Sequence, residues 1–415
     1  MSGRARRASW CAVLALILIR GAAAVEPDAV RKSGCAAQWC AIAGSRLDAL
    51  YDPGLDGEKG HFSAIVRAWG GAAVVGGRLL LWGGGHADSA NNGLFAFDPA
   101  LGWQRLTRPS PWRDADAAAQ TYADGAPKAR HTYGNLFGRG AALYSLGGSI
   151  WKSGVLGPPP AFWRWDGHWQ ALADPRDASM RYHMANACAY DARRDTGWCQ
   201  TASAGLLGYD FRAGRWTRHG AAGVARRTLV AVPERDLLVL VGAGSVQFYR
   251  IDDGVAAALQ AAPAHGALVG LSGRSPGALW DPVLQRVVVW RDDRGVDRRT
   301  VFTIDPQDWS VRAHAVGGAE PPPGAVKGTY GRFALIGDRY YLVNDTGAPV
   351  FTMHRDALGA GVTQDPPHTG ADVQENSRIE RGDRSDAGDE ARDRARGARE
   401  PPPQSGPGWY QEDEF

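Results

Sequence analysis

Apolar residues between positions 62 and 356 come in short runs, some alternating with polar residues and some fully apolar, bounded by Gly, Asp and Pro. The segments 70–75 and 79–82 are examples. Apolar runs of about four to eight residues between such boundaries predict β-strands rather than helices. The turn residues agree, since an Asp-Pro pair ends a predicted strand at 98–99, 281–282 and 305–306. We therefore expect an all-β domain.

The predicted strands recur in a constant order. Each unit has a small-residue apolar strand, a turn, a second apolar strand, a Gly-rich segment, a strand ending in Asp, a turn and a Trp-containing strand. Units begin near residues 70, 133, 185, 228, 277 and 330. Repeated small sheets of this kind predict a β-propeller. We expect six blades, or seven, because the last units have lost part of the pattern.

Short features at the strand ends resemble those of a known family. Gly-Gly occurs within 83–85 and at 147–148, a third strand ends in Phe97-Asp98, and a Trp follows in the next strand. In these features residues 62–356 resemble kelch-type β-propellers. GGGH at 83–86 and RHTY at 130–133 are similar to segments of uncharacterised secreted bacterial kelch-like proteins. The resemblance implies the fold and leaves the activity open, because propellers host many activities.

Residues 1–24 differ from the rest of the chain. Arg4, Arg6 and Arg7 precede an apolar run, and Ala22–Ala24 follow it, which predicts a signal peptide cleaved near Ala24. The Arg pair could also belong to a twin-arginine signal, although its surroundings fit an ordinary leader better. The apolar run is about half the ~20 residues of a membrane span, so no span is expected after cleavage. We predict a secreted or periplasmic protein.

The two segments that flank the repeats have separate expectations. Residues 25–61 are predicted to be an N-terminal extension or a closing strand, and 357–415, which are poor in apolar residues, a disordered tail. The chain carries +3, of which the tail contributes −6 and the leader +4, leaving +5 for 25–356. This excess is too small to indicate a nucleic-acid partner, but it suits an acidic ligand where the cations converge.

Four cysteines remain after the leader, and an even number favours disulfides in an exported protein. Cys188 and Cys199 flank a polar segment centred on 193–194, so a hairpin there would place them opposite each other. We predict a Cys188–Cys199 bridge and a small Cys35–Cys40 loop. A zinc site is the competing interpretation, although neither pair has Cys-x₂-Cys spacing.

Cations recur just before each predicted innermost strand. The predicted innermost strands begin at Trp69-Gly70, Tyr133-Gly134, Met184-Ala185, Leu229-Val230, Pro276-Gly277 and Tyr330-Gly331. The cations upstream are Arg67, Arg130, Arg181, Arg226, Arg274 and Lys327, with His183, Tyr330 and Arg332 nearby. Innermost strands surround the channel, so we expect these side chains to converge on one mouth and bind an acidic polysaccharide. Alternatively, each cation pairs with a carboxylate between blades and stabilises the ring.

Two polar clusters contain the candidate catalytic groups. The segment 83–92 contributes His86, with Asp88 and Asn92 as candidate ligand-binding residues, and 129–133 contributes His131 and Tyr133. In β-elimination on a uronic acid, Arg neutralises the carboxylate, and His and Tyr remove the C5 proton and protonate the leaving oxygen. The architecture is similar to that of ulvan-type propeller lyases, which have a His and Tyr pair of this sort. Alternatively, both histidines are satisfied structural residues.

Other chemistry is less favoured. A copper site like that of galactose oxidase, also a kelch propeller, would need a Tyr cross-linked to Cys, whereas the cysteines here are predicted to form disulfides. We predict no metal site, and the sequence leaves the cofactor open. The leading hypothesis is a secreted propeller that binds an acidic glycan at a cationic channel mouth, with polysaccharide lyase activity as its enzymatic form. The alternative is a protein-interaction propeller of the cell envelope.

Overall fold

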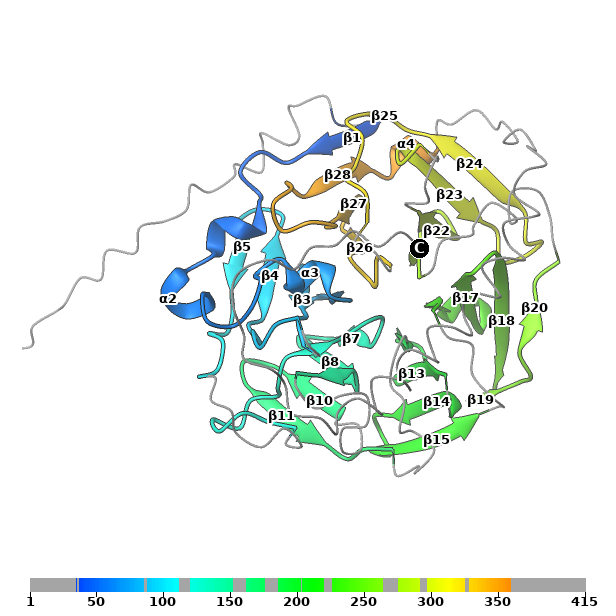
Figure 1. Ribbon diagram of the computed structural model, residues 1–415. Coiled ribbons are helices and arrows are strands. Elements are labelled where there is room, and N and C mark those ends of the chain that lie inside the picture. Colours follow the sequence, from blue (N-terminus) through cyan, green and yellow to red (C-terminus); the bar gives the residue numbers. More distant parts are fainter. Residues whose placement is uncertain are drawn as a thin grey trace, which may run out of the picture. The chain divides into compact units, whose positions relative to one another are not determined.

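Six sheets, antiparallel except for one outer pair in the sixth, are arranged as blades around a central channel in the computed structural model (Figure 1). Each innermost strand contacts the innermost strands of the neighbouring blades, and the sixth contacts the first. All described residues belong to the compact unit Met1–Asp365. They are 35, 37–85, 88–111, 120–151, 162–175, 186–202, 204–219, 226–263, 275–291, 297–324 and 328–359. The predicted all-β propeller is confirmed, with six blades.

The blades follow the predicted units, and the innermost strand is named first here. Blade 1 has β2 (Gly71–Val75), β3 (Arg78–Trp82), β4 (Phe95–Asp98) and β5 (Gly102–Arg105). Blade 2 has β7 (Leu136–Arg139), β8 (Ala142–Leu146), β10 (Phe162–Trp165) and β11 (Trp169–Leu172). Blade 3 has β12 (Ala187–Asp191), β13 (Thr196–Thr201), β14 (Gly205–Asp210) and β15 (Arg215–His219).

The later blades keep this order, and blades 4 and 6 have an additional strand at the outer edge. Blade 4 has β16 (Thr228–Val232), β17 (Leu237–Gly242), β18 (Ser245–Asp252), β19 (Val255–Ala256) and β20 (Gln260–Ala261). Blade 5 has β21 (Gly277–Asp281), β22 (Arg286–Trp290), β23 (Thr300–Ile304) and β24 (Val311–Ala315). Blade 6 has β26 (Phe333–Ile336), β27 (Arg339–Leu342), β28 (Phe351–His354), β1 (Gln38–Ala41) and β25 (Gly317–Gly318).

The remaining elements are short. A two-stranded ladder pairs β6 (Arg130–His131) with β9 (Ser149–Ile150). The helices are η1 (Leu47–Leu50), α2 (Pro53–Asp56), α3 (Ala64–Arg67), η2 (Pro233–Arg235) and α4 (Asp356–Gly359). In the part of the chain described above, no helix has the length and apolar character needed to cross a membrane.

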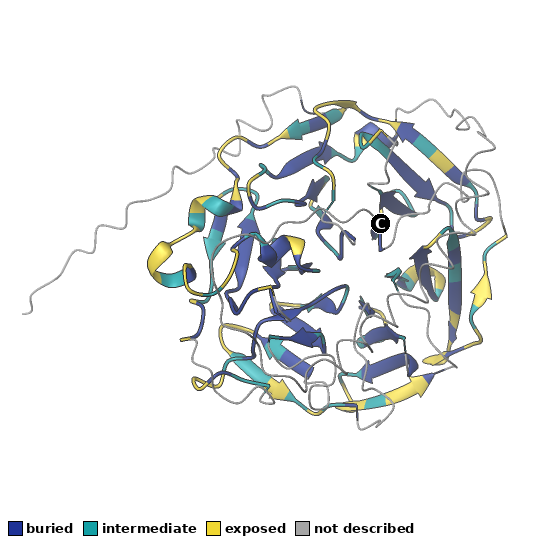
Figure 2. Cartoon of the chain, viewed as in Figure 1, coloured by how far each residue is buried: buried dark blue, intermediate teal, exposed yellow. Residues whose placement is uncertain are grey.

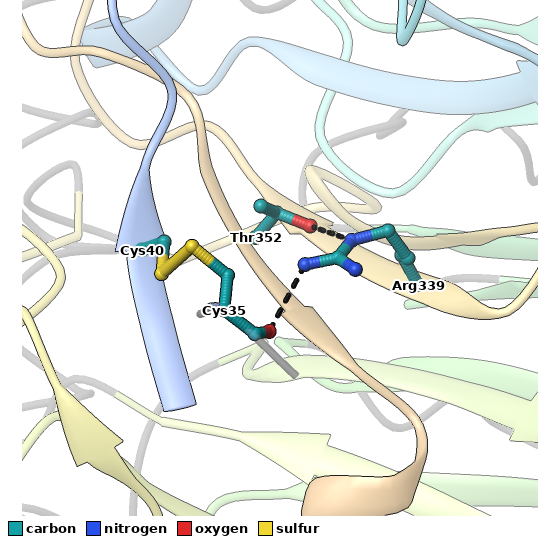
Figure 3. Close-up of a disulfide and its surroundings, with 4 residues drawn as sticks. All are labelled: Cys35, Cys40, Arg339 and Thr352. Atoms are coloured by element: carbon teal, nitrogen blue, oxygen red, sulfur yellow. Dashed lines mark hydrogen bonds between the residues drawn. A yellow bond between two sulfur atoms is a disulfide. The ribbon is translucent and has the colours of Figure 1, made fainter. Parts of the chain in front are cut away.

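The N-terminal strand β1 closes the ring. It pairs antiparallel with the last blade strand β28, with Cys40 opposite Thr352. Its Trp39 is fully buried and donates from Nε1 to the carbonyl of Arg299 at 3.1 Å. A disulfide joins Cys40 within the strand to Cys35 just before it, and Arg339 donates to Thr352 Oγ1 and to the Cys35 carbonyl (Figure 3). The segment expected to be an extension or closing strand therefore supplies the closing strand.

The second disulfide lies within blade 3. Cys188 on β12 pairs directly with Cys199 on β13, and their Cα atoms are 4.1 Å apart. The hairpin between 191 and 196 thus brings the cysteines together as predicted. Two disulfides are typical of a protein that folds outside the cytoplasm, in an extracellular or periplasmic compartment.

The core is divided among the interfaces between neighbouring blades, where most strand residues are buried (Figure 2). Between blades 1 and 2, for example, Trp82 and Leu80 pack with Leu136 and Leu143. Close approach near the axis requires glycine at some positions. A Cβ on Gly138 would lie 2.0 Å from the carbonyl oxygen of Val74 in the next blade.

The C-terminal boundary lies slightly beyond the expected one. Ala357 and Leu358 in α4 are buried and pack with the blade 6 core, so the ordered contacts extend past 356. The predicted signal peptide, residues 1–24, and the rest of the predicted tail, 360–415, lie outside the described residues.

Candidate functional site at one mouth of the channel

The channel wall is formed by the six innermost strands and encloses about 370 Å³. Its side chains are small or apolar, such as Ala72, Leu136, Trp280 and Phe333, and Tyr330 also lines it. Within the described ranges the lining contains no charged side chain. Charged groups that could contact a ligand in the channel must therefore come from the segments at the two ends of the innermost strands.

A ring of left-handed residues surrounds one mouth. Five non-glycine residues of the described chain that lead into innermost strands have positive φ. They are Trp69 (50°), Tyr133 (47°), Arg226 (61°), Ser275 (46°) and Tyr330 (46°). Bulky residues rarely adopt this conformation.

Backbone hydrogen bonds join this ring from blade to blade. Tyr133 donates to the Trp69 carbonyl at 2.8 Å, and Ser275 donates to the Arg226 carbonyl at 3.0 Å. Thr329, next to Tyr330, donates to the Ser275 carbonyl at 2.9 Å. In blades 4 and 5 the equivalent residues are thus Arg226 and Ser275, whereas the sequence alignment used Leu229 and Pro276.

Aromatic rings gather in one part of this mouth. The Trp69 ring stacks on the His131 imidazole with a centroid distance of 4.4 Å. The rings of Tyr133 and Tyr330 meet edge to face at 5.8 Å, and both side chains are buried. Burial raises the pKa of Tyr330 well above its ordinary value, and the neighbouring Tyr133 raises it further. Tyr330 is therefore a neutral phenol at physiological pH.

A carboxylate, an imidazole and a phenol form a connected array here. Asp88 Oδ2 lies 2.7 Å from His131 Nε2, and the Tyr133 hydroxyl lies 3.4 Å from His131 Nδ1. The carboxylate can only accept, so Nε2 carries the imidazole proton and Nδ1 is left to accept from Tyr133. Asp88 is 40% exposed, whereas His131 is nearly covered. This arrangement can take up the phenolic proton, as histidine does in other nucleophile and base pairs.

Two of the candidate arginines lie inside the protein. Arg130 is fully buried and donates to the carbonyls of Lys128, Gly147 and Gln120. Its guanidinium lies 5.4 Å from the Trp82 ring centroid, and burial lowers its pKa below the ordinary value. Arg332 is also fully buried and donates to the carbonyls of Thr329, Val66 and Gly328. We expected both cations to face a ligand at the mouth. Both are instead buried and surrounded by backbone carbonyls, which does not fit that expectation.

Other candidates occupy different places. Arg67 is exposed and pairs with Asp345 at 2.5 Å. This contact agrees with the alternative in which each cation pairs with a carboxylate and stabilises the ring. Asn92 is buried and bonds Ser110 and the Pro127 carbonyl, so it fixes a loop. Arg226 stands in the ring itself, and its charge acts on Tyr330. The remaining candidates lie outside the described residues: His86, Arg181, His183, Arg274 and Lys327.

The structure adds Trp69 to the candidate residues. Sequence reasoning used it only to align the units, although an aromatic followed by Gly begins units 1, 2 and 6 in the same way. That shared pair was the available signal, because it marks the left-handed residue in these three units.

Ion pairs join neighbouring blades at the other end of the innermost strands. Arg139 at the end of β7 binds Asp195 of the blade 3 hairpin at 2.5 Å, and Tyr190 donates to the same carboxylate. Arg194 of that hairpin pairs with Asp236 of blade 4. These charges bind one another, so this end is stabilised by contacts within the protein.

Comparisons with known proteins give no family for the chain. No family model matches it, and neither does any curated protein. Among solved structures it is similar to TolB from Acinetobacter baumannii, with 13% sequence identity and a TM-score of 0.33. That alignment covers 58% of this chain and 55% of the TolB chain, so the match spans about half of each protein.

Proposed function

We propose that this protein is an exported propeller that binds an acidic polysaccharide at the channel mouth defined by Trp69, Tyr133 and Tyr330, and cleaves it by β-elimination. The observation that carries the proposal is the Asp88–His131–Tyr133 array beside these aromatic rings. Aromatic faces beside a few polar groups are typical of ligand sites. The charge of Arg226, which already acts on Tyr330, supplies attraction for a carboxylate.

The chemistry assigns a role to each group. His131, oriented by Asp88, accepts the Tyr133 proton, and the phenolate oxygen removes the C5 proton next to the uronate carboxylate. The C5 electron pair then forms the C4–C5 double bond as the glycosidic oxygen leaves. Tyr330, a neutral phenol, protonates that oxygen. Positive charge near the carboxylate lowers the barrier because it stabilises the negative charge that develops there.

The rival hypothesis, a protein-interaction propeller, calls for a contiguous exposed apolar patch. The exposed large apolar side chains of the described chain are Tyr51, Leu101, Val255 and Val283. They belong to the N-terminal segment and to blades 1, 4 and 5, which favours the glycan over a protein partner.

The test measures turnover and binding separately. Polygalacturonate and alginate are incubated with the protein, and the ultraviolet absorbance of unsaturated products is followed. Tyr133→Phe and His131→Ala should each lower turnover by about 10²- to 10⁴-fold while polymer binding persists. His168→Ala is the control, because His168 is a 67% exposed histidine on the outer hairpin of blade 2.

Each outcome of this test is decisive. Binding without turnover by the unaltered protein would refute the lyase step and leave a glycan-binding propeller. Absence of both binding and turnover would refute the proposed function and favour a protein partner. Full turnover in Tyr133→Phe would remove Tyr133 as the base.

A further inference from the structure

A second cleft lies on the N-terminal segment that precedes blade 1. It encloses about 630 Å³ between residues 48–63 and Thr346 of blade 6. Tyr51 forms part of its wall and is 44% exposed, and it is the aromatic member of the exposed large apolar set in the described chain. His61 and Ser63 also line it, together with Asp48, whose carboxylate is paired with Arg46 at 2.6 Å, and the buried Thr346. We call this site the outer cleft.

The wall of the outer cleft is fixed in place. The Tyr51 ring meets Phe62 edge to face at 5.5 Å, and Phe62 meets Phe95 of the blade 1 core at 5.6 Å. At the end of α2, fully buried Asp56 receives two hydrogen bonds from Arg105 of β5, at 3.0 and 2.6 Å. A preformed wall reduces the entropy lost when a ligand binds.

The same anchors connect the outer cleft to the channel mouth. Asn91 donates to Asp56 Oδ1 at 2.7 Å, and Asn91 belongs to the loop that carries Asp88. Gly60, in the cleft wall, forms a bridge with Ser89. On the other side, α3 leads from Ser63 to Trp69 and is one turn long, about 6 Å. The cleft and the mouth are therefore connected by short segments of the chain on both sides.

We infer that the outer cleft is a sugar-binding subsite for the glycan chain that occupies the mouth, with one pyranose ring stacked on Tyr51. This inference rests on the proposed function. An apolar ring face combined with several hydroxyl, carboxylate and imidazole groups matches a sugar, which has an apolar face and a hydroxylated edge. The cleft volume lies within the range of small-ligand sites. The preferred ligand is therefore a polymer long enough to reach both places.

The experiment compares chain lengths and one side chain. Affinities for polygalacturonate, alginate and their disaccharide fragments are measured for the unaltered protein, Tyr51→Ala and Tyr51→Phe. Tyr51→Ala should weaken polymer binding about tenfold, equivalent to about 1.4 kcal/mol, and leave disaccharide binding unchanged. Tyr51→Phe should bind the polymer normally because it keeps the ring. Val283→Ala, at the 68% exposed Val283 of the blade 5 hairpin, is the matched control.

The outcomes separate this inference from the proposed function. Polymer affinity unchanged in Tyr51→Ala would overturn the subsite and leave the function of the mouth standing. Equal weakening for polymer and disaccharide would also overturn it, since the cleft would then not be separate. The neutral polymers mannan and xyloglucan form the second arm. If the protein bound only these neutral polymers, and Tyr51→Ala weakened that binding, the subsite would be supported and the acidic ligand refuted. Binding of no polymer would refute both.

Discussion

Replacing Asp281 with Ala should strongly destabilise the protein. Asp281 ends β21 and is fully buried. Its Oδ2 accepts from the Tyr340 hydroxyl and from Arg355 Nε at 2.7 Å, both in blade 6, and its Oδ1 accepts from the backbone of Val283 and Leu284. Removing one partner of a buried ion pair costs about 3–5 kcal/mol, because the other charge is left without compensation.

Urea and thermal unfolding measure this cost. An unfolding entropy of about 2.1 cal/mol/K per residue over about 325 residues gives roughly 0.7 kcal/mol/K, so a loss of 4 kcal/mol lowers Tm by about 6 °C. Asp98→Ala is the matched control. Asp98 also precedes Pro and accepts from two backbone groups, of Ala100 and Leu101, but no side-chain donor is found for it among the described residues. Asp98→Ala should therefore lower the free energy of unfolding by only about 1 kcal/mol.

The Asp281–Arg355 ion pair should also make the stability of the protein depend on pH. Burial disfavours the Asp281 carboxylate, but hydrogen bonds from Tyr340 and Arg355 outweigh it and hold the pKa of Asp281 below its ordinary value. A depressed folded-state pKa adds stability above about pH 3.9, the ordinary carboxyl value, and that stability is lost as pH falls through the folded pKa. Asp281→Asn should remove this acid-side loss. Equal costs for Asp281→Ala and Asp98→Ala would refute the ion-pair argument.

Two further predictions concern stability. Replacing both Cys188 and Cys199 with Ser should lower the free energy of unfolding by about 3 kcal/mol, because the bridge restricts the unfolded chain; an unchanged urea midpoint would contradict this. Burial raises the pKa of Asp174 to about 6, against a hydrogen bond from the Phe162 backbone and the charge of Arg130. In the folded state the Asp174 carboxyl therefore stays protonated to a higher pH than in the unfolded chain. The free energy of unfolding should fall as pH rises from about 4 to about 6. Urea midpoints of Asp174→Asn should lack this decline.

The sequence predicted the strands well because their signals are local. Each blade strand is a short apolar run ended by Gly, Asp or Pro, and the period of the units followed from these runs. The Cys188–Cys199 bridge followed from symmetry about one hairpin. The closure of the ring was harder to predict from the sequence. The pairing of β1 with β28 joins residues that are more than 300 positions apart, and no local pattern specifies it.

The site was only partly predictable, because the direction of a side chain depends on the turn before each strand. His131, Tyr133 and Asp88 were proposed from two separate segments, and they do lie together. Arg130 and Arg332 stand in equally suggestive places, yet both point into the protein and bind backbone carbonyls. A count of cations before the strands cannot distinguish these cases. The hydrogen-bond partners can, because the two arginines bind backbone carbonyls, whereas His131 contacts the side chains of Asp88 and Tyr133.

Backbone strain gives a separate physical reason to place function at this mouth. A left-handed conformation in a non-glycine residue costs of order 1–3 kcal/mol and persists only where its surroundings enforce it. Glycine would take the same conformation without steric cost, so the backbone alone does not need Trp69, Tyr133 or Tyr330 at these positions. What those residues add is side chains, and these form the aromatic cluster around His131. At the opposite end Asp195 and Asp236 are also left-handed, but there their carboxylates form ion pairs with Arg139 and Arg194. Only at the mouth described above do left-handed residues of the described chain coincide with the aromatic cluster and the Asp88–His131–Tyr133 array.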